Sequence, residues 1–323
     1  MVQCEIINYS AEWSEKLRDY LSKTFPNYTE PYVNYCVERS CDRVPAILVI
    51  NVKKEIVGCH LFFCTKAFIN GEEIHTQWGH DTYLNKEYRA IAGLDLVLSI
   101  HAKKGFGLGL TRIAERIQNK LKYVFFDGVF NYYVINRFFI FSIIQGFFSI
   151  KPNIKVTNVI NVGNVVFRRV SNVNDIMIPN NGFWFKDYRN IDFIRDADYL
   201  MGRFFNNKVY PYYFYSYSDG KQSAYFVIRH SFYRGIPSLV LSDYRYTDNN
   251  SQLLDSILKA VNIIALKSNL GVIIFRCGDS NMRKIIRKRI HYSTPLEFVS
   301  NRRDNSKMTF IVTGGDSDSD FLM

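Results

Sequence analysis

Several features that would assign a function at once are missing from this chain of 323 residues. Its 6 cysteines include no C-x-x-C pair and lie mostly among apolar neighbours near the start of the chain, so we expect reduced, buried thiols. No basic-then-apolar leader opens the sequence, because Met1–Tyr9 runs into the charged stretch Glu12–Lys23. We therefore expect a cytoplasmic location.

The sequence also lacks an apolar run long enough to cross a membrane. The most apolar segment, Phe138–Ile150 (FFIFSIIQGFFSI), is too short and is interrupted by Gln145. We interpret it as part of the core, with contact at a membrane surface as the alternative. No integral membrane segment is expected.

Charge narrows the partners without choosing one. The formal charge of +11 indicates an anionic partner, which could be nucleic acid, a phosphorylated cofactor or a membrane surface. Basic residues are spread along the chain, with the densest run at Arg283–Arg289, and no common nucleic-acid-binding motif is present. DNA is therefore not an expected partner. The hydrophobic content of 47% is ample for a core of one large domain or two smaller ones.

Periodicity predicts an α/β order in the first half of the chain. A hairpin is expected at Asn70-Gly71, because Asn-Gly readily adopts positive φ, and Thr111 is an expected helix cap. The predicted elements are helices at Ser10–Phe25 and Glu30–Ser40, strands at Pro45–Asn51, Ile56–Phe68 and Glu73–Leu84, a helix at Ala90–Lys103, a buried strand at Gly105–Leu110, a helix at Arg112–Lys122 and a strand pair at Tyr123–Ile135.

A similar order recurs after a connection that is rich in Asn, Val and aromatic residues. The predicted elements are strands at Tyr212–Tyr217, Ser223–Tyr233 and Ser238–Tyr246, helices at Ser251–Lys267 and Ser280–Ile290, a buried strand at Gly271–Cys277, and closing strands at Tyr292–Ser300 and Met308–Thr313. Asp81 and Asp243 take similar places before their helices. We infer an internal duplication with domains at 1–150 and 209–323 and a connection at 151–208. Any α/β chain can be aligned loosely with itself, which is the alternative.

The stretch Trp78–Leu98 carries the clearest functional pattern. A strand passes through a turn at Lys86–Arg89 directly into a helix, whose free backbone N–H groups and positive dipole end suit a phosphate or pyrophosphate. An ordinary strand-to-helix junction with a solvated Arg89 is the alternative. The glycines of Gly105–Leu110 do not form a P-loop, because no Lys-Ser or Lys-Thr follows them.

This region resembles the GCN5-related N-acetyltransferase superfamily, in a tandem arrangement like that of the Fem peptidoglycan aminoacyltransferases. Its motif, Arg/Gln-x-x-Gly-x-Gly/Ala, corresponds to Arg89-Ala90-Ile91-Ala92-Gly93-Leu94, and the following helix matches at Ala114, Ile117, Lys120, Leu121 and Tyr123. The resemblance implies an α/β (α+β) fold of two tandem domains, each a mixed, mainly antiparallel sheet flanked by helices. It implies acetyl-CoA, or another acyl-CoA, bound by Tyr83, Leu84, Arg89, Ala90, Ile91, Ala92, Gly93 and Leu94.

The chain departs from the motif of this superfamily at three positions. Ala92 and Leu94 replace glycines, which reduces the room for backbone to approach phosphate oxygens. The tyrosine that often protonates the leaving thiolate in the superfamily would fall at Gln118, which cannot donate that proton. The acid is therefore expected elsewhere, in solvent or on a tyrosine from another strand.

His80 and Asp81 are the candidate catalytic bases, with His75 farther back on the same predicted strand. Transfer of an acyl group to an amine needs the amine deprotonated, and a histidine with a reference pKa near 6.5 suits that step. Neighbouring residues of a strand face opposite ways, so we expect only one of His80 and Asp81 to line the cleft. For each residue, a hydrogen-bonded place in the sheet is the alternative.

Other patterns give weaker signals. No metal site is expected, because His75, His80 and Asp81 have no supporting ligand at the usual spacing. The stretch Gly314–Asp320 looks like a calcium loop without its distal Glu, so we expect a solvated acidic tail that could engage Arg283–Arg289. The aromatic run Tyr210–Tyr217, with Trp184 and Tyr188, could stack on a sugar ring or form core.

Together these features predict an acyl-CoA-dependent N-acetyltransferase that acts on a small-molecule amine, such as an amino sugar or sugar nucleotide. The first alternative is a Fem-like aminoacyltransferase that uses charged tRNA, but no long heptad pattern for a coiled-coil arm is visible, so tRNA is not the expected partner. The second is a catalytically silent acetyltransferase-like binding module, which the changes at Ala92, Leu94 and Gln118 favour.

Overall fold

The computed structural model describes residues 3–40, 46–69, 71–103, 105–150, 154–180, 182–185, 190–247, 250–301 and 309–316. The chain divides into two compact units. Unit 1 contains Met1–Lys66, His75–Phe126 and Glu297–Ser306, and unit 2 contains Ala67–Ile74, Asp127–Leu296 and Lys307–Met323. Each unit thus includes segments that are distant in the chain. The expected domain boundaries at residues 150 and 208 remain a prediction about an internal duplication.

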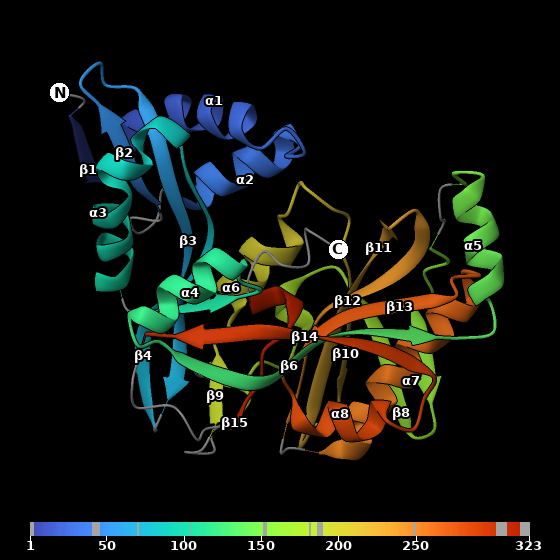
Figure 1. The fold of residues 1–323 in the computed structure, drawn as a ribbon. Helices are drawn as coiled ribbons and strands as arrows, with labels where there is room; N and C mark the ends of the chain where they lie inside the picture. The colour runs from blue at the N-terminus through green and yellow to red at the C-terminus, as the bar shows by residue number, and fades with distance from the viewer. Residues whose placement is uncertain are drawn as a thin grey trace. The chain divides into compact units, whose positions relative to one another are not determined.

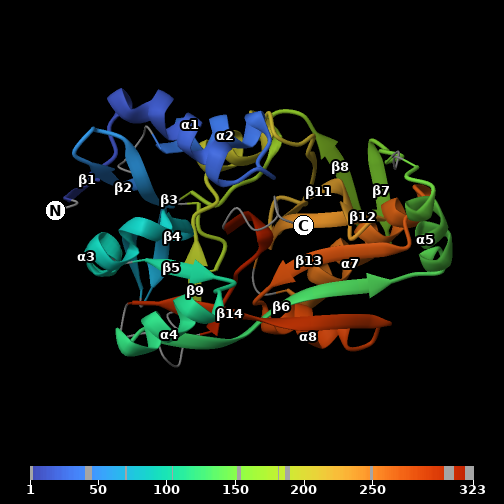
Figure 2. The same ribbon diagram turned by 45° about the horizontal axis from the view of Figure 1, so that its top comes forward.

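Unit 1 contains a mixed sheet in which the strands follow the order β1-β2-β3-β4-β5-β14. β1, β2 and β3 pair antiparallel, whereas β4 and β5 run parallel. Helices α1 and α2 lie on one side of these strands and α3 on the other (Figures 1 and 2). The elements that lie wholly in this unit are β1 (Cys4–Asn8), α1 (Ser14–Thr24), α2 (Glu30–Ser40), β2 (Ala46–Asn51), α3 (Arg89–Ala102), β5 (Phe106–Leu108) and α4 (Arg112–Lys120). Most of β3 (Ile56–Ile69) and β4 (Glu72–Leu84) and parts of β6 (Val124–Ile135) and β14 (His291–Ser300) also belong to it.

Two of the apolar clusters that stabilise unit 1 involve its sheet and α3. Ala92 and Leu96 on the inner face of α3 pack against buried side chains of β2 and β3, including Val49. The second cluster is aromatic: Phe298 of β14 stacks on Trp78 of β4 and on Phe106 of β5, with ring centroids 5.7 and 5.6 Å apart. Burying such rings fixes β14 beside β5 and sets the start of the parallel strand pair.

Unit 2 follows the strand order β6-β13-β12-β11-β10-β8-β7, in which β12 and β13 run parallel and every other neighbouring pair is antiparallel. Its elements are α5 (Phe139–Phe147), β7 (Val159–Val162), β8 (Val165–Val170), β9 (Asn190–Phe193), α6 (Ala197–Leu200), β10 (Tyr213–Ser218), β11 (Ser223–Tyr233), β12 (Ile236–Tyr246), α7 (Ser251–Lys267), β13 (Val272–Cys277), α8 (Ser280–Ile286) and β15 (Thr309–Phe310). An antiparallel meander followed by one parallel strand therefore occurs in both units.

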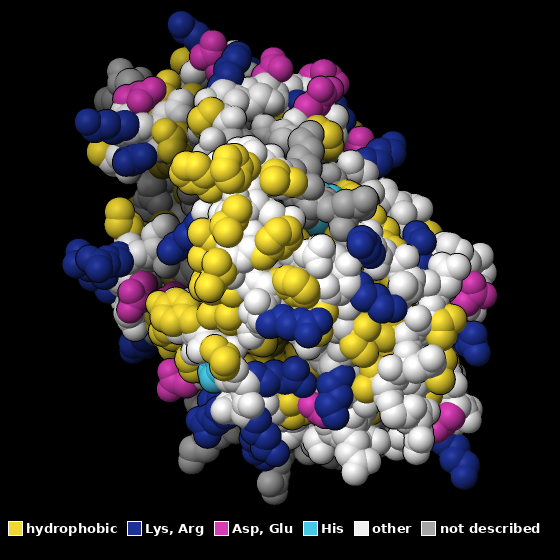
Figure 3. Space-filling view, turned by 90° about the vertical axis from the view of Figure 1, so that its right-hand side faces the viewer, with side chains coloured by type: hydrophobic (Ala, Val, Ile, Leu, Met, Phe, Trp, Pro, Cys, Tyr) yellow, Lys and Arg dark blue, Asp and Glu magenta, His cyan; other side chains and the backbone are white. Residues whose placement is uncertain are grey.

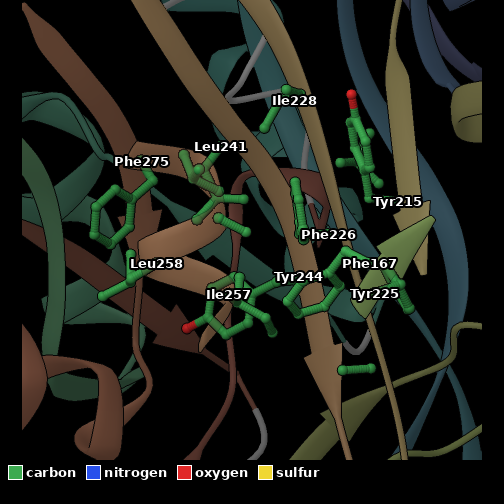
Figure 4. Close-up of a cluster of buried hydrophobic side chains, with 14 of the residues drawn as sticks. Phe167, Tyr215, Tyr225, Phe226, Ile228, Leu241, Tyr244, Ile257, Leu258 and Phe275 are labelled. Carbon is green, nitrogen blue, oxygen red and sulfur yellow. The ribbon is translucent and has the colours of Figure 1, made fainter. Parts of the chain in front are cut away.

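The core of unit 2 forms between α7 and the sheet (Figure 4). Asn250 caps α7, with its Oδ1 accepting from the N–H groups of Gln252 and Leu253, and the helix buries eight side chains. Ile257 and Leu258 of this helix face side chains of the sheet such as Tyr244 (Figure 4). Apolar residues at spacings of three and four in 251–267 explain why the predicted bounds of this helix are confirmed.

A fully buried ionic network lies at Asp243 of β12. Its carboxylate accepts from Arg195 Nε at 2.7 Å and Arg245 Nη1 at 3.2 Å, and Arg195 Nη2 also donates to Asp316 at 2.6 Å. Burial alone would raise the pKa of Asp243, but the two guanidinium groups outweigh burial and lower it. The network fastens the 309–316 segment to β12 within unit 2. The expectation of a solvated tail is therefore wrong for Asp316, which is buried and pairs with Arg195.

Other expectations also need correction. Residues 124–135 form one long strand, β6, instead of a strand pair. In the predicted aromatic run, Phe214 and Tyr215 are core residues, as is Trp184, so they offer no open platform for a sugar. Cys64 is exposed, although Cys36, Cys59 and Cys277 are buried as expected. Asn70 of the predicted hairpin and Tyr188 lie outside the described residues.

The segment Phe138–Ile150 is not core either. It forms helix α5, in which Ser142 is the buried residue while several Ile and Phe side chains are exposed. Among the residues that the structure describes, no helix has both the length and the apolar character needed to cross a membrane.

Candidate functional site

A pocket of about 400 Å³ opens in unit 1 where β4 and β5 separate. The two strands pair at Trp78–Phe106 and Gly79–Gly107, and beyond these pairs His80–Thr82 and Leu108–Thr111 line opposite walls. Gly105 allows the close approach of β5 to β4, because an added Cβ would lie 2.7 Å from the Gln77 carbonyl oxygen. The glycines of Gly105–Leu110 thus serve a short strand, as predicted, and not a P-loop.

The backbone of β4 is irregular at Asp81, where φ is +28°. This is a left-handed conformation that a residue with a side chain rarely adopts, and such strain is concentrated at functional sites. It interrupts the alternation of side chains along the strand. The expectation that only one of His80 and Asp81 lines the cleft is therefore wrong: both line the pocket, with His80 Nδ1 3.0 Å from Asp81 Oδ2.

Two aromatic residues complete the environment of this pair. The Tyr28 hydroxyl, from the turn after α1, donates a hydrogen bond to the same Asp81 oxygen. Phe63 of β3 stacks on the His80 ring with centroids 4.3 Å apart. The His80 side chain is 6% exposed and that of Asp81 24% exposed, so the pair is sheltered but open to the pocket. The sequence offered no spacing signal that links Tyr28 to Asp81.

His60 of β3 is a second histidine at the pocket that sequence reasoning missed. Its Nδ1 lies 2.7 Å from Thr82 Oγ1, and its ring packs over Gly79, where an added Cβ would lie 3.1 Å from Cε1. Burial, with a smaller contribution from His80, lowers the pKa of His60 from 6.5 to about 3. His60 is therefore neutral at physiological pH, so it acts as a hydrogen-bonding wall residue instead of a proton carrier.

Tyr123, which follows α4, also lines the pocket. Burial raises the pKa of its phenol, and a hydrogen bond with Asn301 partly offsets that rise. Asn301 itself holds the loop between α3 and β5, since its Oδ1 accepts from Gly105 N–H at 2.9 Å and its Nδ2 donates to His101 O at 2.8 Å. Gln118 lines the same pocket.

The strand-to-helix junction lies at the end of β4 as predicted. A 3-10 turn at Lys86–Tyr88 leads into α3, which begins at Arg89. Arg89 Nε donates to Leu84 O at 3.0 Å, and the guanidinium carbon lies 5.9 Å from the centre of the Tyr83 ring. This contact holds the exposed Arg89 guanidinium beside the N-terminus of α3. The positive charge and the positive end of the helix dipole both favour an anion at this place.

The two glycine replacements in this motif obstruct less than the sequence suggests. The Ala92 methyl group is buried in the core cluster with Val49 and Leu96, so it does not narrow the solvent side of the turn. Leu94 is 70% exposed. Gly93 and Leu94 lie beyond the first turn of α3, where backbone N–H groups bond within the helix, so the N–H groups available to a phosphate belong to earlier residues.

No metal site competes with this interpretation in the part of the chain that the structure describes. There, no group of three or more His, Cys, Asp and Glu side chains could hold a metal ion. His75 is exposed on β4 and does not line the pocket.

Replacing His60 with Gln should change how stability depends on pH. In the unfolded chain His60 is protonated below about pH 6.5, whereas in the folded chain it stays neutral down to about pH 3. Protonation therefore favours the unfolded chain, and the free energy of unfolding decreases as the pH falls through this range. His60→Gln keeps a polar partner for Thr82 but does not titrate. Between pH 6.5 and pH 4 the free energy of unfolding should therefore decrease by up to about 3 kcal/mol less in His60→Gln than in the unaltered chain. Urea denaturation across this pH range measures the difference. His75→Gln, on an exposed residue, is the control. Equal pH dependence in H60Q and the unaltered chain would contradict the assignment of a neutral, buried imidazole.

Comparisons with known proteins place this geometry in a fold family. No family model matches the sequence, and no curated protein matches it. Solved structures do match. A GCN5-related N-acetyltransferase from Anabaena variabilis has a TM-score of 0.56 at 10% identity, over 92% of this chain and 72% of the other. A probable N-acyltransferase from Enterococcus faecalis has a TM-score of 0.60 at 11% identity, over 95% and 74%.

An N-myristoyltransferase from Saccharomyces cerevisiae, solved with bound myristoyl-CoA and inhibitors, has a TM-score of 0.57 at 10% identity, over 92% of this chain and 80% of the other. These matches span most of each chain, so they concern the whole arrangement of elements and not a local motif. The resemblance seen in the sequence is confirmed at the level of fold: the chain has the fold of the GCN5-related N-acetyltransferases, with a mixed, mainly antiparallel sheet flanked by helices.

Proposed function

We propose that this chain is an acyl-CoA-dependent N-acyltransferase that acts on a small amine. The observation that carries the proposal is the pocket between β4 and β5, where the left-handed Asp81 brings His80 and a carboxylate together. A pocket of about 400 Å³ is within the usual size range for small-molecule sites. The fold neighbours include acyltransferases, one of them solved with myristoyl-CoA.

The residues around the junction of β4 and α3 fit an acyl-CoA. Arg89 would provide a fixed cation for the pyrophosphate, and the first N–H groups of α3, at Ala90 and Ile91, would donate to it. The backbone of Tyr83 and Leu84 would border the arm that leads to the thioester. Ala92 would support the turn from the core side, and Gly93 and Leu94 would border the ligand only through their exposed surface. When bound, acyl-CoA supplies an acyl group activated as a thioester.

His80 is proposed as the general base, with Asp81 and Tyr28 as positioning residues. If Asp81 Oδ2 accepts the proton of His80 Nδ1, the neutral ring carries its lone pair on Nε2, which can accept a proton from an ammonium group in the pocket. The Tyr28 hydroxyl, which donates to the same oxygen, holds the carboxylate in place. Of the two bases predicted from the sequence, His80 thus keeps the role of base in this proposal, and Asp81 takes the role of orienting it.

Tyr123 is proposed as the acid that protonates the departing thiolate. Its phenol keeps its proton at neutral pH because burial raises its pKa. Tyr123 and Gln118 both line the pocket. The resemblance expects the acid tyrosine at the position of Gln118, whose amide cannot donate a comparable proton, and Tyr123 lies five residues farther along the chain. The proton on Tyr123 Oη would pass to sulfur, and solvent would restore it afterwards.

An amino sugar or sugar nucleotide remains the proposed acceptor class, and the pocket itself does not select one amine. The buried aromatic run gives it no support, so it rests on the resemblance of the tandem arrangement. A catalytically silent binding module would show the same fold, and the experiments below separate it from an enzyme.

Calorimetry with acetyl-CoA tests the cofactor. The unaltered chain should bind, and Arg89→Glu should weaken binding by about tenfold or more, because it places a like charge against the pyrophosphate and removes a charge-assisted hydrogen bond. Arg112→Glu, on α4, is a matched charge reversal that should leave affinity nearly unchanged. No heat with the unaltered chain, or equal affinity after Arg89→Glu, would contradict the proposed cofactor site.

Turnover across a panel of amino sugars and simple amines tests the base. His80→Gln should lower kcat/KM by about 10²- to 10⁴-fold, the usual contribution of a general base. Asp81→Asn should lower it less and move the acid limb of the pH profile to lower pH, because the imidazole loses its carboxylate partner. His75→Gln is the control on the same strand. Binding of acetyl-CoA without turnover on any amine would favour the silent module instead.

Tyr123→Phe should lower kcat by about tenfold or more with little change in KM, because the lost proton matters only as the thiolate departs. Tyr217→Phe, which removes an exposed hydroxyl in unit 2, is the matched control and should leave kcat unchanged. An unchanged kcat for Tyr123→Phe would show that solvent supplies the proton.

A further inference from the structure

Helix α5 turns a polar side chain toward the protein and its apolar side chains toward solvent. A surface helix normally turns its apolar side chains to the protein and its polar ones to water. Here Ser142 is fully buried, and its Oγ accepts a hydrogen bond from Gly271 N–H at 2.6 Å. The outward side chains of the helix and its end are apolar: Ile140, Phe141, Ile143, Ile144, Phe147 and Phe148 are between 43% and 84% exposed.

The helix is held firmly in this orientation by close backbone contacts within unit 2. An added Cβ at Gly146 would lie 2.1 Å from Gly235 O, and one at Gly271 would lie 2.3 Å from Phe139 Cα. Asn136 fastens the start of the helix, since its Nδ2 donates to Leu270 O at 2.8 Å and its Oδ1 accepts from Phe138 N–H at 2.9 Å. The exposed apolar face is therefore presented by a well-docked helix.

Further apolar side chains adjoin α5. Ile290, 74% exposed, lies beside the last residue of β6, because Ile135 N–H donates to Ile290 O at 3.0 Å. Tyr133 shares a hydroxyl hydrogen bond of 2.7 Å with Tyr233 and lies 5.8 Å from the Tyr292 ring. Figure 3 shows hydrophobic side chains gathered on this side of the molecule, with Lys and Arg side chains among and below them and a few Asp and Glu side chains near the lower edge. The helix and these neighbours form what we term the α5 face.

The chain segments that build this face carry basic but no acidic residues. The sequence from Gly128 to Asn174 contains Arg137, Lys151, Lys155, Arg168 and Arg169 and no Asp or Glu. The sequence 221–242, which includes the hairpin against Gly146, and the sequence 280–296 are also free of Asp and Glu. An apolar surface bordered in this way is complementary to a surface that is apolar inside and negatively charged outside.

We propose that the α5 face binds the surface of a membrane that contains anionic lipids. Phe and Ile side chains of α5 enter the boundary between headgroups and acyl chains, tyrosines lie at headgroup level, and nearby Lys and Arg side chains contact lipid phosphates. A second copy of the chain is a poorer occupant. A two-fold dimer would bring the same face of each copy together and set basic segments against basic segments.

Flotation of the full chain with vesicles tests this proposal. The unaltered chain should bind vesicles of phosphatidylcholine with phosphatidylglycerol more tightly than vesicles of phosphatidylcholine alone, and added salt should weaken the binding. The double variant Ile140→Asn with Phe147→Asn should bind at least about tenfold more weakly, because two large side chains no longer enter the apolar region. Both residues are more than 70% exposed, so the thermal unfolding midpoint should match that of the unaltered chain.

Ile113→Asn is the matched control, since Ile113 is 71% exposed on α4 and Ile140 is 72% exposed. It should bind vesicles as the unaltered chain does. Three outcomes would overturn the proposal: no binding of the unaltered chain to either vesicle, equal loss of binding in Ile113→Asn, or a dimer in sedimentation that the double variant dissociates. The last result would show that a second copy covers the α5 face.

Discussion

The left-handed backbone at Asp81 is the constraint on which the candidate site depends. A regular strand would place His80 and Asp81 on opposite faces of the sheet, and neither could then position the other. The irregularity brings Nδ1 and Oδ2 to 3.0 Å, beside the gap that β5 leaves when it parts from β4. The strain is offset by the contacts around it, since Tyr28 bonds to the carboxylate and Phe63 stacks on the imidazole.

Strand β12 of unit 2 carries a carboxylate, Asp243, whose surroundings differ from those of Asp81. The pairing of β11 with β12 shifts in register at Ser242, which has no partner on β11, and Asp243 follows directly. There the carboxylate is fully buried and bonded to Arg195, Arg245 and Thr313. A buried, paired carboxylate cannot exchange protons with a substrate, and removing one partner would leave an uncompensated charge. The two carboxylates therefore differ in burial: the Asp81 side chain is 24% exposed at the pocket, whereas that of Asp243 is fully buried.

Much of the fold could be predicted from the sequence, because its signals are local. The helix at Ser251–Lys267 has apolar spacing and an Asn cap, and Thr111 caps α4 through its side chain, as expected. The failures have two physical causes. Asp81 and Asp316 owe their surroundings to residues distant in the chain, Tyr28 and Arg195, which no pattern of spacing reveals. The α5 segment was interpreted as core because composition reports how apolar a segment is and not which of its faces is covered.

The site was predictable in its chemistry but not in its geometry. His80 and Asp81 stood out by residue type, and Arg89 by its place before a helix, yet their relation to the pocket needed the backbone conformation at Asp81. Ala92 was expected to hinder cofactor binding because sequence motifs do not show where a methyl group points. The structure places that methyl in the core.

Hydrogen exchange of the full chain with and without acetyl-CoA tests the central claim most directly, because it locates the ligand without assuming a substrate. The account predicts slower exchange in β4 and the start of α3, at about 79–91, and in the segment from Gly105 to Thr111, with α7 and β12 unchanged. Protection confined to unit 2, or no protection at a saturating concentration of acetyl-CoA, would contradict it.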